Sequence, residues 1–218
     1  MQASELMTKL HGIDIYAGFD ATPYPDDIQG WNSEHPLLQE AIRVIRPGLV
    51  IEVGVWKGAS TIFMAEQLRA AGLESAVLAI DTFLGSITHL TRPESRAALA
   101  PRHGWPQLYY LFLANVLRRK LQDYVVPLAQ TADTAFQLLQ QMGLRPQLVH
   151  IDAAHDHESV ARDLNNYYSL LAPGGALVGD DFTTNWPEVV WAATEFAHRH
   201  RLNLQQHSGK FLLQKPNV

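Results

Sequence analysis

The stretch from Leu49 to Ser60, LVIEVGVWKGAS, constrains the fold of this 218-residue chain more than any other segment. It opens with three apolar residues, two of them β-branched, which is typical of a strand buried in a parallel sheet. An acid follows at Glu52, glycines follow at positions 54 and 58, and an apolar segment with helical spacing covers 62–68. This order predicts a strand, a glycine turn and a helix, which form the first crossover of a nucleotide-type α/β fold.

The spacing of the two glycines narrows the choice of ligand. Gly54 permits a tight bend, and Gly58 leaves room for a ligand or for the next helix because it has no Cβ. The pattern lacks the middle glycine of a dinucleotide-binding motif, and Lys57 precedes its glycine, whereas a P-loop lysine follows it. Glu52 would repel a phosphate and suits a ligand that carries an ammonium group. The loop is therefore not built for pyrophosphate or triphosphate.

The rest of the chain alternates between strand and helix patterns. Apolar strands are predicted at 76–80, 124–129, 147–151 and 176–179, and helices at 33–45, 59–72, 106–121, 132–142, 157–171 and 186–200. Short strands at 202–206 and 210–214 flank a tight turn and predict a hairpin. This pattern predicts a doubly wound, mostly parallel sheet with helices on both faces.

Two segments fall outside that alternation. We expect residues 1–30 to form an N-terminal arm or lid with a short helix over 1–10. Residues 31–218 are expected to form a single domain. Residues 82–104 form an insertion that we expect to be irregular, at the edge of the sheet where long loops carry specificity.

Acidic residues follow several predicted strands. Asp81 ends the second strand, a position that grips a ribose diol in nucleotide-binding folds, although an aspartate there also caps helices. Asp152, Asp180 and Asp181 end two strands that should be neighbours. Three carboxylates at one place repel each other unless a cation offsets their charge, and oxygen ligands suit Mg²⁺ or Mn²⁺. The alternative is that these aspartates only hold turns and backbone amides.

Taken together, these motifs resemble a known family. Glu-x-Gly-x-x-x-Gly-x-Ser over 52–60, the ordered acids and the Leu-x-Pro-Gly-Gly motif over 171–175 resemble the class I S-adenosylmethionine (SAM)-dependent methyltransferases. The similar branch holds the catechol and macrolide sugar O-methyltransferases, and the resemblance covers 31–215. It implies a Rossmann-like, seven-stranded sheet with an antiparallel C-terminal strand. It also implies methylation of a small-molecule hydroxyl, catechol-like or sugar-like, with SAM and Mg²⁺ or Mn²⁺ as cofactors.

The resemblance also implies roles for individual residues. Asp152, Asp180 and Asp181 match metal ligands, and His155 falls near the catalytic base, a lysine in catechol enzymes, with Asp152 beside it. Thr131 matches a residue beside the adenine, although it is an equally good cap for the helix over 132–142. The sugar-modifying relatives usually read Asp-Gly-Asp where this chain reads Asp152-Ala-Ala-His155, so the acceptor class stays open. The expected cofactor-binding residues are Glu52, Gly54, Trp56, Gly58, Ser60, Asp81, Thr131 and Asp152.

Composition excludes several classes of protein. The net charge of −5 argues against a nucleic-acid-binding protein, and the absence of cysteine excludes disulfides and thiolate catalysis. No apolar run is long enough to span a membrane and the N-terminus lacks the core of a signal peptide, so we expect a cytoplasmic protein that binds no membrane. A homodimer is compatible with the sequence.

Two other functions are compatible with the same motifs. A methyltransferase fold that binds its ligand without catalysis would keep most of them. An NAD(P)-dependent oxidoreductase is disfavoured by the missing glycine.

Overall fold

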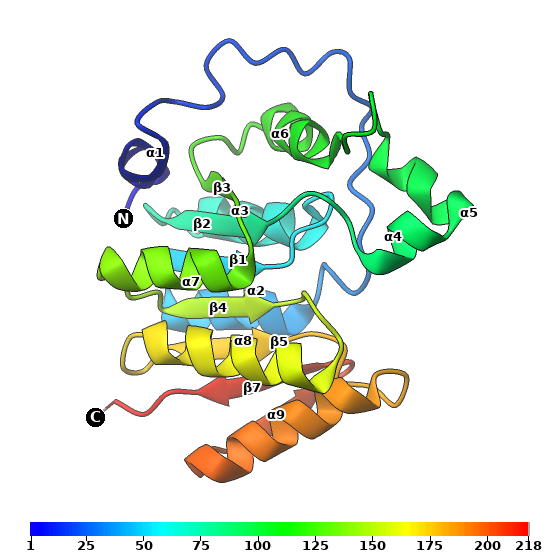
Figure 1. Ribbon diagram of the computed structural model, residues 1–218. Helices are drawn as coiled ribbons and strands as arrows, with labels where there is room; N and C mark the ends of the chain where they lie inside the picture. Colours follow the sequence, from blue (N-terminus) through cyan, green and yellow to red (C-terminus); the bar gives the residue numbers. More distant parts are fainter. Residues whose placement is uncertain (218) are drawn as a thin grey trace.

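A seven-stranded sheet of order β3-β2-β1-β4-β5-β7-β6 forms the centre of the computed structural model, which describes residues 1–217 (Figure 1). The strands from β1 to β5 pair in parallel, and β7 runs antiparallel to both β5 and β6. The predicted sheet and its antiparallel C-terminal hairpin are therefore confirmed. The strands are β1 Leu49–Val53, β2 Ala76–Asp81, β3 Val125–Ala129, β4 Leu148–Ile151, β5 Ala176–Gly179, β6 Leu204–His207 and β7 Lys210–Gln214.

Helices cover both faces of this sheet. In Figure 1, α7, α8 and α9 lie in front of the sheet, and α2 and α3 lie behind it. No helix among residues 1–217 is both long and apolar enough to cross a membrane. The helices are α1 Ala3–His11, α2 Pro36–Ile45, α3 Ala59–Ala70, α4 Ile87–Thr91, α5 Pro93–Arg96, the 3₁₀ turn η1 Ala97–Leu99, α6 Leu108–Arg118, α7 Ala132–Gln141, α8 His157–Leu170 and α9 Pro187–His200.

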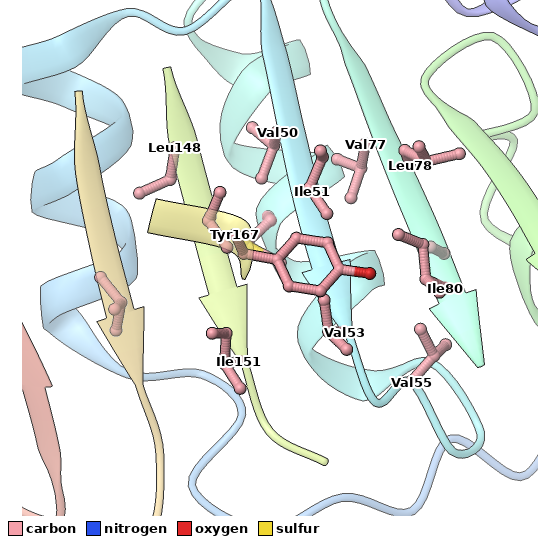
Figure 2. Close-up of a cluster of buried hydrophobic side chains, with 14 of the residues drawn as sticks. Val50, Ile51, Val53, Val55, Val77, Leu78, Ile80, Leu148, Ile151 and Tyr167 are labelled. Carbon is pink, nitrogen blue, oxygen red and sulfur yellow. The ribbon is translucent and has the colours of Figure 1, made fainter. Parts of the chain in front are cut away.

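Burial on both faces explains the apolar strands. Every residue of β1 is buried, which a parallel strand covered by helices on both sides requires. Tyr167 of α8 belongs to the same buried cluster as Val53 and Ile151 (Figure 2), and its hydroxyl donates a hydrogen bond to the carbonyl oxygen of Ala132 at 2.8 Å. The order of the strands reverses between β1 and β4, so a crevice opens at the carboxyl ends of these two strands.

The structure corrects two local predictions. The insertion at 82–104, expected to be irregular, contains α4, α5 and η1. Helix α2 begins at Pro36, three residues later than predicted, because the Nδ1 atom of His35 accepts the hydrogen bond from the Leu37 amide at 3.0 Å. Proline fits the first position of a helix because its missing N–H has no partner there.

The predicted N-terminal arm divides into two parts. Helix α1 buries Ala3, Leu6 and Met7 and contacts β2 and β3, so it packs on the domain. The stretch 12–35 has neither helix nor strand, and it passes over α6 before reaching the edge of the sheet (Figure 1). The guanidinium of Arg118 in α6 donates hydrogen bonds to carbonyl oxygens of Ala21, Tyr24 and Pro25, which anchors this stretch.

One buried acid on α8 works against the stability of the fold at neutral pH. Asp163 is 3% exposed, and among residues 1–217 its Oδ1 atom has no hydrogen-bond partner. Burial raises the pKa of Asp163 from 3.8 to about 7. The folded protein therefore holds this proton to a higher pH than the unfolded chain does. The resulting stability is complete below pH 3.8 and is lost as the pH rises to about 7.

We predict that Asp163→Asn stabilises the protein above neutral pH, because asparagine fills the same space without a charge. At about 1.4 kcal/mol for each pH unit, the gain is on the order of 4 kcal/mol above neutrality and small near pH 4. Urea unfolding at the two pH values measures it. Glu158 is an exposed acid on the same helix, and Glu158→Gln is the control. It should change the free energy of unfolding only slightly, and by the same amount at the two pH values. An Asp163→Asn effect that does not depend on pH would contradict the prediction.

Candidate active site

A cavity of about 950 Å³ opens at the carboxyl ends of the strands. Its walls come from the glycine loop after β1, the loops after β2, β4 and β5, the insertion, and the N-terminal stretch. Eight of the predicted site residues line it, namely Gly54, Trp56, Ser60, Asp81, Asp152, His155, Asp180 and Asp181. Glu52, Gly58 and Thr131 are not among its lining residues.

The two glycines of the loop have different neighbours. Gly54 has a φ of 85°, and a Cβ on it would lie 1.9 Å from the carbonyl oxygen of Asp152, so the β1 and β4 loops meet closely only because this residue is glycine. A Cβ on Gly58 would lie 2.7 Å from the ring of Phe112. Gly58 therefore makes room for α6, and not for the ligand or the following helix α3 that the sequence suggested.

Trp56 connects the glycine loop to the insertion. Its backbone is in the left-handed region with a φ of 54°, which is uncommon for a bulky residue. Its indole stacks on the imidazole of His89, with ring centroids 4.5 Å apart. The next residue, Lys57, forms an ion pair with Asp27, so the same loop also holds the N-terminal stretch.

Asp81 shapes the loop from the end of β2. Its Oδ2 atom accepts hydrogen bonds from the backbone amides of Val55 at 2.8 Å and Trp56 at 2.9 Å, and its Oδ1 atom accepts one from Phe83 at 2.8 Å. A carboxylate has roughly four lone-pair sites, so these three bonds leave one for a ligand hydroxyl. Asp81 lies in the cavity wall, and its contact with a ribose stays a prediction.

Glu52 does not face the cavity, which corrects the expectation that it meets a ligand ammonium group. It is fully buried in β1, where it accepts hydrogen bonds from the hydroxyls of Ser60 and Thr61 and lies 3.0 Å from the Nδ1 atom of His150. Burial raises its pKa to about 7. Successive side chains of a strand point to opposite faces of the sheet, and Glu52 points to the face that α3 covers. Its hydrogen bonds with Ser60 and Thr61 therefore hold the first turn of that helix.

Thr131 has the role of a helix cap. Its hydroxyl accepts a hydrogen bond from the amide of Thr134 at 3.2 Å at the start of α7. Its neighbours Gln130 and Ala132 line the cavity instead. The sequence left a contact with adenine and a helix cap equally open for Thr131, and the structure shows the helix cap.

The acids after β4 and β5 meet at the cavity wall, as predicted. Ligand atoms of Asp152, His155 and Asp181 lie within 4.8 Å of one another, and so do those of His150, Asp152 and Asp180. Burial raises the pKa of Asp152 to about 8, and the negative charge of Asp180 adds to that effect. Carboxylate oxygens crowded in this way fit a hard divalent cation.

His155 is held on two sides. Its Nε2 atom lies 2.6 Å from Oδ2 of Asp181, and its ring stacks on Trp186 with centroids 4.0 Å apart. The hydrogen bond with Asp181 raises the pKa of this imidazole above its ordinary value. His157 lies outside the cavity wall, where it contacts Glu195 at 2.9 Å. The two histidines therefore have separate surroundings.

Several cavity residues carried no clear signal in the sequence. The N-terminal stretch contributes Trp31 and Asn32, the loop after β3 contributes Gln130, and the loop after β5 contributes Trp186. Lys210, fully buried beneath the wall on β7, was also missed. A lysine at the start of the apolar strand KFLLQ was the one available hint, because lysine is almost never fully buried without a partner.

Comparisons with known proteins agree with this geometry. Residues 51–182 match a family model described as a methyltransferase domain. None of the curated proteins matches the chain by sequence.

Solved structures share the fold. An O-methyltransferase from Bacillus cereus in complex with SAH is 17% identical with a TM-score of 0.59, over 97% of this chain and 91% of that one. The O-methyltransferase NovP is 21% identical with a TM-score of 0.61, over 83% and 78%. TomG, an O-methyltransferase from Streptomyces achromogenes involved in tomaymycin synthesis and in complex with SAM, is 14% identical with a TM-score of 0.57, over 98% and 89%.

We predict that Gly54→Ala destabilises the fold far more than Gly72→Ala. Both glycines have a left-handed φ, of 85° and 62°, but a Cβ on Gly72 meets nothing within 4 Å. Gly72→Ala should cost about 1 kcal/mol of backbone strain, and Gly54→Ala at least about 3 kcal/mol because strand β1 or the β4 loop must move. Urea unfolding measures both, and equal losses would show that the Gly54–Asp152 approach is unimportant.

Proposed function

The chain belongs to the methyltransferase domain family, and from this premise we propose that it is a SAM-dependent enzyme that methylates a hydroxyl group of a small molecule. The observation that carries the proposal is one continuous cavity whose wall includes both the glycine loop and His155 with the acid cluster, which consists of Asp152, Asp180 and Asp181. Its volume of about 950 Å³ is near the upper end of ligand pockets, which leaves room for a cofactor and an acceptor together.

The cofactor end of the cavity is proposed to be the glycine loop. Gly54, Trp56, Ser60, Asp81 and Asp152 line it, and the helix that follows presents its first amides there. Glu52 and Gly58 would act from below, by fixing α3 and α6. The solved structures named with SAH and SAM share this fold, which supports the choice of cofactor.

The acceptor end is proposed to be the wall formed by His155, Trp186 and the N-terminal stretch. SAM supplies an electrophilic methyl group for in-line displacement. If the Nε2–H of His155 donates to Asp181, the Nδ1 atom is free to take the proton of the acceptor hydroxyl. The oxygen–methyl bond forms as the sulfur–methyl bond breaks, the sulfonium becomes a neutral thioether, and the proton stays on His155.

Asp152, Asp180 and Asp181 are proposed to hold Mg²⁺ or Mn²⁺, which would supply Lewis acidity toward an acceptor oxygen. The donor set fits such an ion because carboxylate oxygens are the hard ligands that Mg²⁺ and Mn²⁺ prefer. A catechol-like or a sugar-like acceptor, with two adjacent oxygens, suits a site of this kind.

The N-terminal stretch is proposed to act as a cover for the acceptor end. Trp31 and Asn32 line the cavity, and the ion pair between Asp27 and Lys57 ties this cover to the glycine loop. A domain that binds its ligands without catalysis is the second possibility, and it would keep the cofactor site without depending on His155.

We predict that the protein binds S-adenosylhomocysteine (SAH) and that Asp81→Ala weakens binding at least about tenfold, because the variant loses three amide contacts that shape the loop. Isothermal calorimetry measures the affinity. Asp123→Ala, an exposed acid before β3, is the matched control and should bind like the parent. If the parent does not bind SAH, the proposed cofactor is wrong.

We predict that His155→Ala lowers kcat on the order of 10²–10⁴-fold, as the loss of a general base does, while SAH affinity changes by less than about threefold. The measurement is methyl transfer to a panel of catechols and glycosides, alongside calorimetry. His157→Ala is the control and should retain nearly full turnover. Unchanged turnover in His155→Ala would remove the histidine from the mechanism.

A further inference from the structure

A lysine is buried beneath the acid cluster. Lys210 of β7 has no exposed surface, and its ammonium group forms an ion pair with Oδ2 of Asp180 and lies 3.2 Å from the Nε2 atom of His150. His150 in turn contacts Glu52, so a continuous polar path joins β1, β4, β7 and the end of β5. Fully buried lysines are rare and need a reason.

The charges around Lys210 show which group it serves. His150 offers Lys210 a ring nitrogen rather than a carboxylate, and its other ring nitrogen faces Glu52. Burial raises the pKa of Glu52 to about 7, and its hydrogen bonds to hydroxyl groups already satisfy it. Among residues 1–217, Lys210 is the only lysine or arginine that forms an ion pair with the acid cluster.

Both oxygens of Asp180 already have partners. Its Oδ2 atom accepts from Lys210, and its Oδ1 atom accepts from the amide of Asp181 at 2.8 Å and from the side-chain amide of Asn32 at 3.3 Å. The carboxylate is therefore held in one orientation by protein groups alone. A divalent cation that binds Asp180 must approach an ammonium group on the same carboxylate.

We propose that Lys210 is a positioning residue that acts as an internal counter-cation: it holds Asp180 in place and competes with a divalent cation for that carboxylate. The inference rests on the proposed metal site. Two cations within a few ångströms repel each other even at an effective dielectric constant of about 20. Lys210 thus weakens metal binding, and the cluster keeps its geometry when the metal leaves.

The positive charge of Lys210 determines how stability should change when the side chain is replaced. Removal of the ammonium group leaves the acids uncompensated, which destabilises the metal-free protein. A divalent cation then compensates more negative charge in the variant than in the parent, so it stabilises the variant more. A lysine that served only to pack β7 would instead change the stability of both forms equally.

The test is Lys210→Met, which preserves most of the shape and removes the charge, with Lys210→Arg as the charge-preserving control. Mn²⁺ binding is followed by electron paramagnetic resonance at mildly alkaline pH, and melting temperature is measured with and without Mn²⁺. We expect Lys210→Met to bind Mn²⁺ at least about tenfold more tightly, to melt lower without metal and to gain more from Mn²⁺ than the parent does. Lys210→Arg should bind close to the parent value.

Mn²⁺ affinity that is unchanged or weaker in Lys210→Met would overturn the role of Lys210 while leaving the metal site intact. Absence of Mn²⁺ binding in the parent and in Lys210→Met would instead overturn the metal site, and the role of Lys210 with it. Asp152→Asn, which should lose Mn²⁺ binding, identifies the cluster as the place where the ion binds.

If Lys210→Met does not fold, the parent protein decides the question. The ammonium resonance of Lys210 in protein labelled with ¹⁵N-lysine should shift on titration with Mg²⁺. A resonance that does not move while calorimetry records Mg²⁺ binding would overturn the proposal.

Discussion

The close approach of the Gly54 backbone to the carbonyl oxygen of Asp152 is the contact on which the rest of the site depends. It joins the loops after β1 and β4, the neighbouring strands at which the strand order reverses. The glycine loop can then receive the amide contacts of Asp81 from one side and the support of Glu52 from below. The cavity opens at that junction because no side chain fills it.

The second constraint is a surplus of negative charge at the ends of β4 and β5. The acids cannot all be ionised at close range without compensating positive charge. Lys210 pairs with Asp180, and His155 pairs with Asp181. One of these partners is buried below the cavity and the other lies in its wall. The same charge arrangement therefore places one partner in the interior and an imidazole in the wall of the cavity.

Strands and loop ends were predictable because their signals are local. Apolar β-branched runs followed by Gly54, Asp81 or Asp152 predict where each strand stops, and parallel strands bring their carboxyl ends to one edge. Glu52 was placed wrongly because a strand sequence shows which side chains share a face of the sheet but not whether that face meets the cavity or a helix. The helices within 82–104 were missed because they are short and none of the residues of α4 or α5 is buried, so their apolar residues follow no core-facing pattern.

The sequence by itself determined the α/β architecture, the glycine turn and the set of acids at the strand ends, because each depends on backbone preferences and on periodic burial. Only the tertiary structure decided what those residues touch. It turned Glu52 inward, made Thr131 a helix cap, brought Trp31 and Asn32 of the N-terminal stretch to the cavity, and placed the ammonium of Lys210 on Asp180. These contacts join residues far apart in the chain, and their geometry follows from packing between elements rather than from any local pattern.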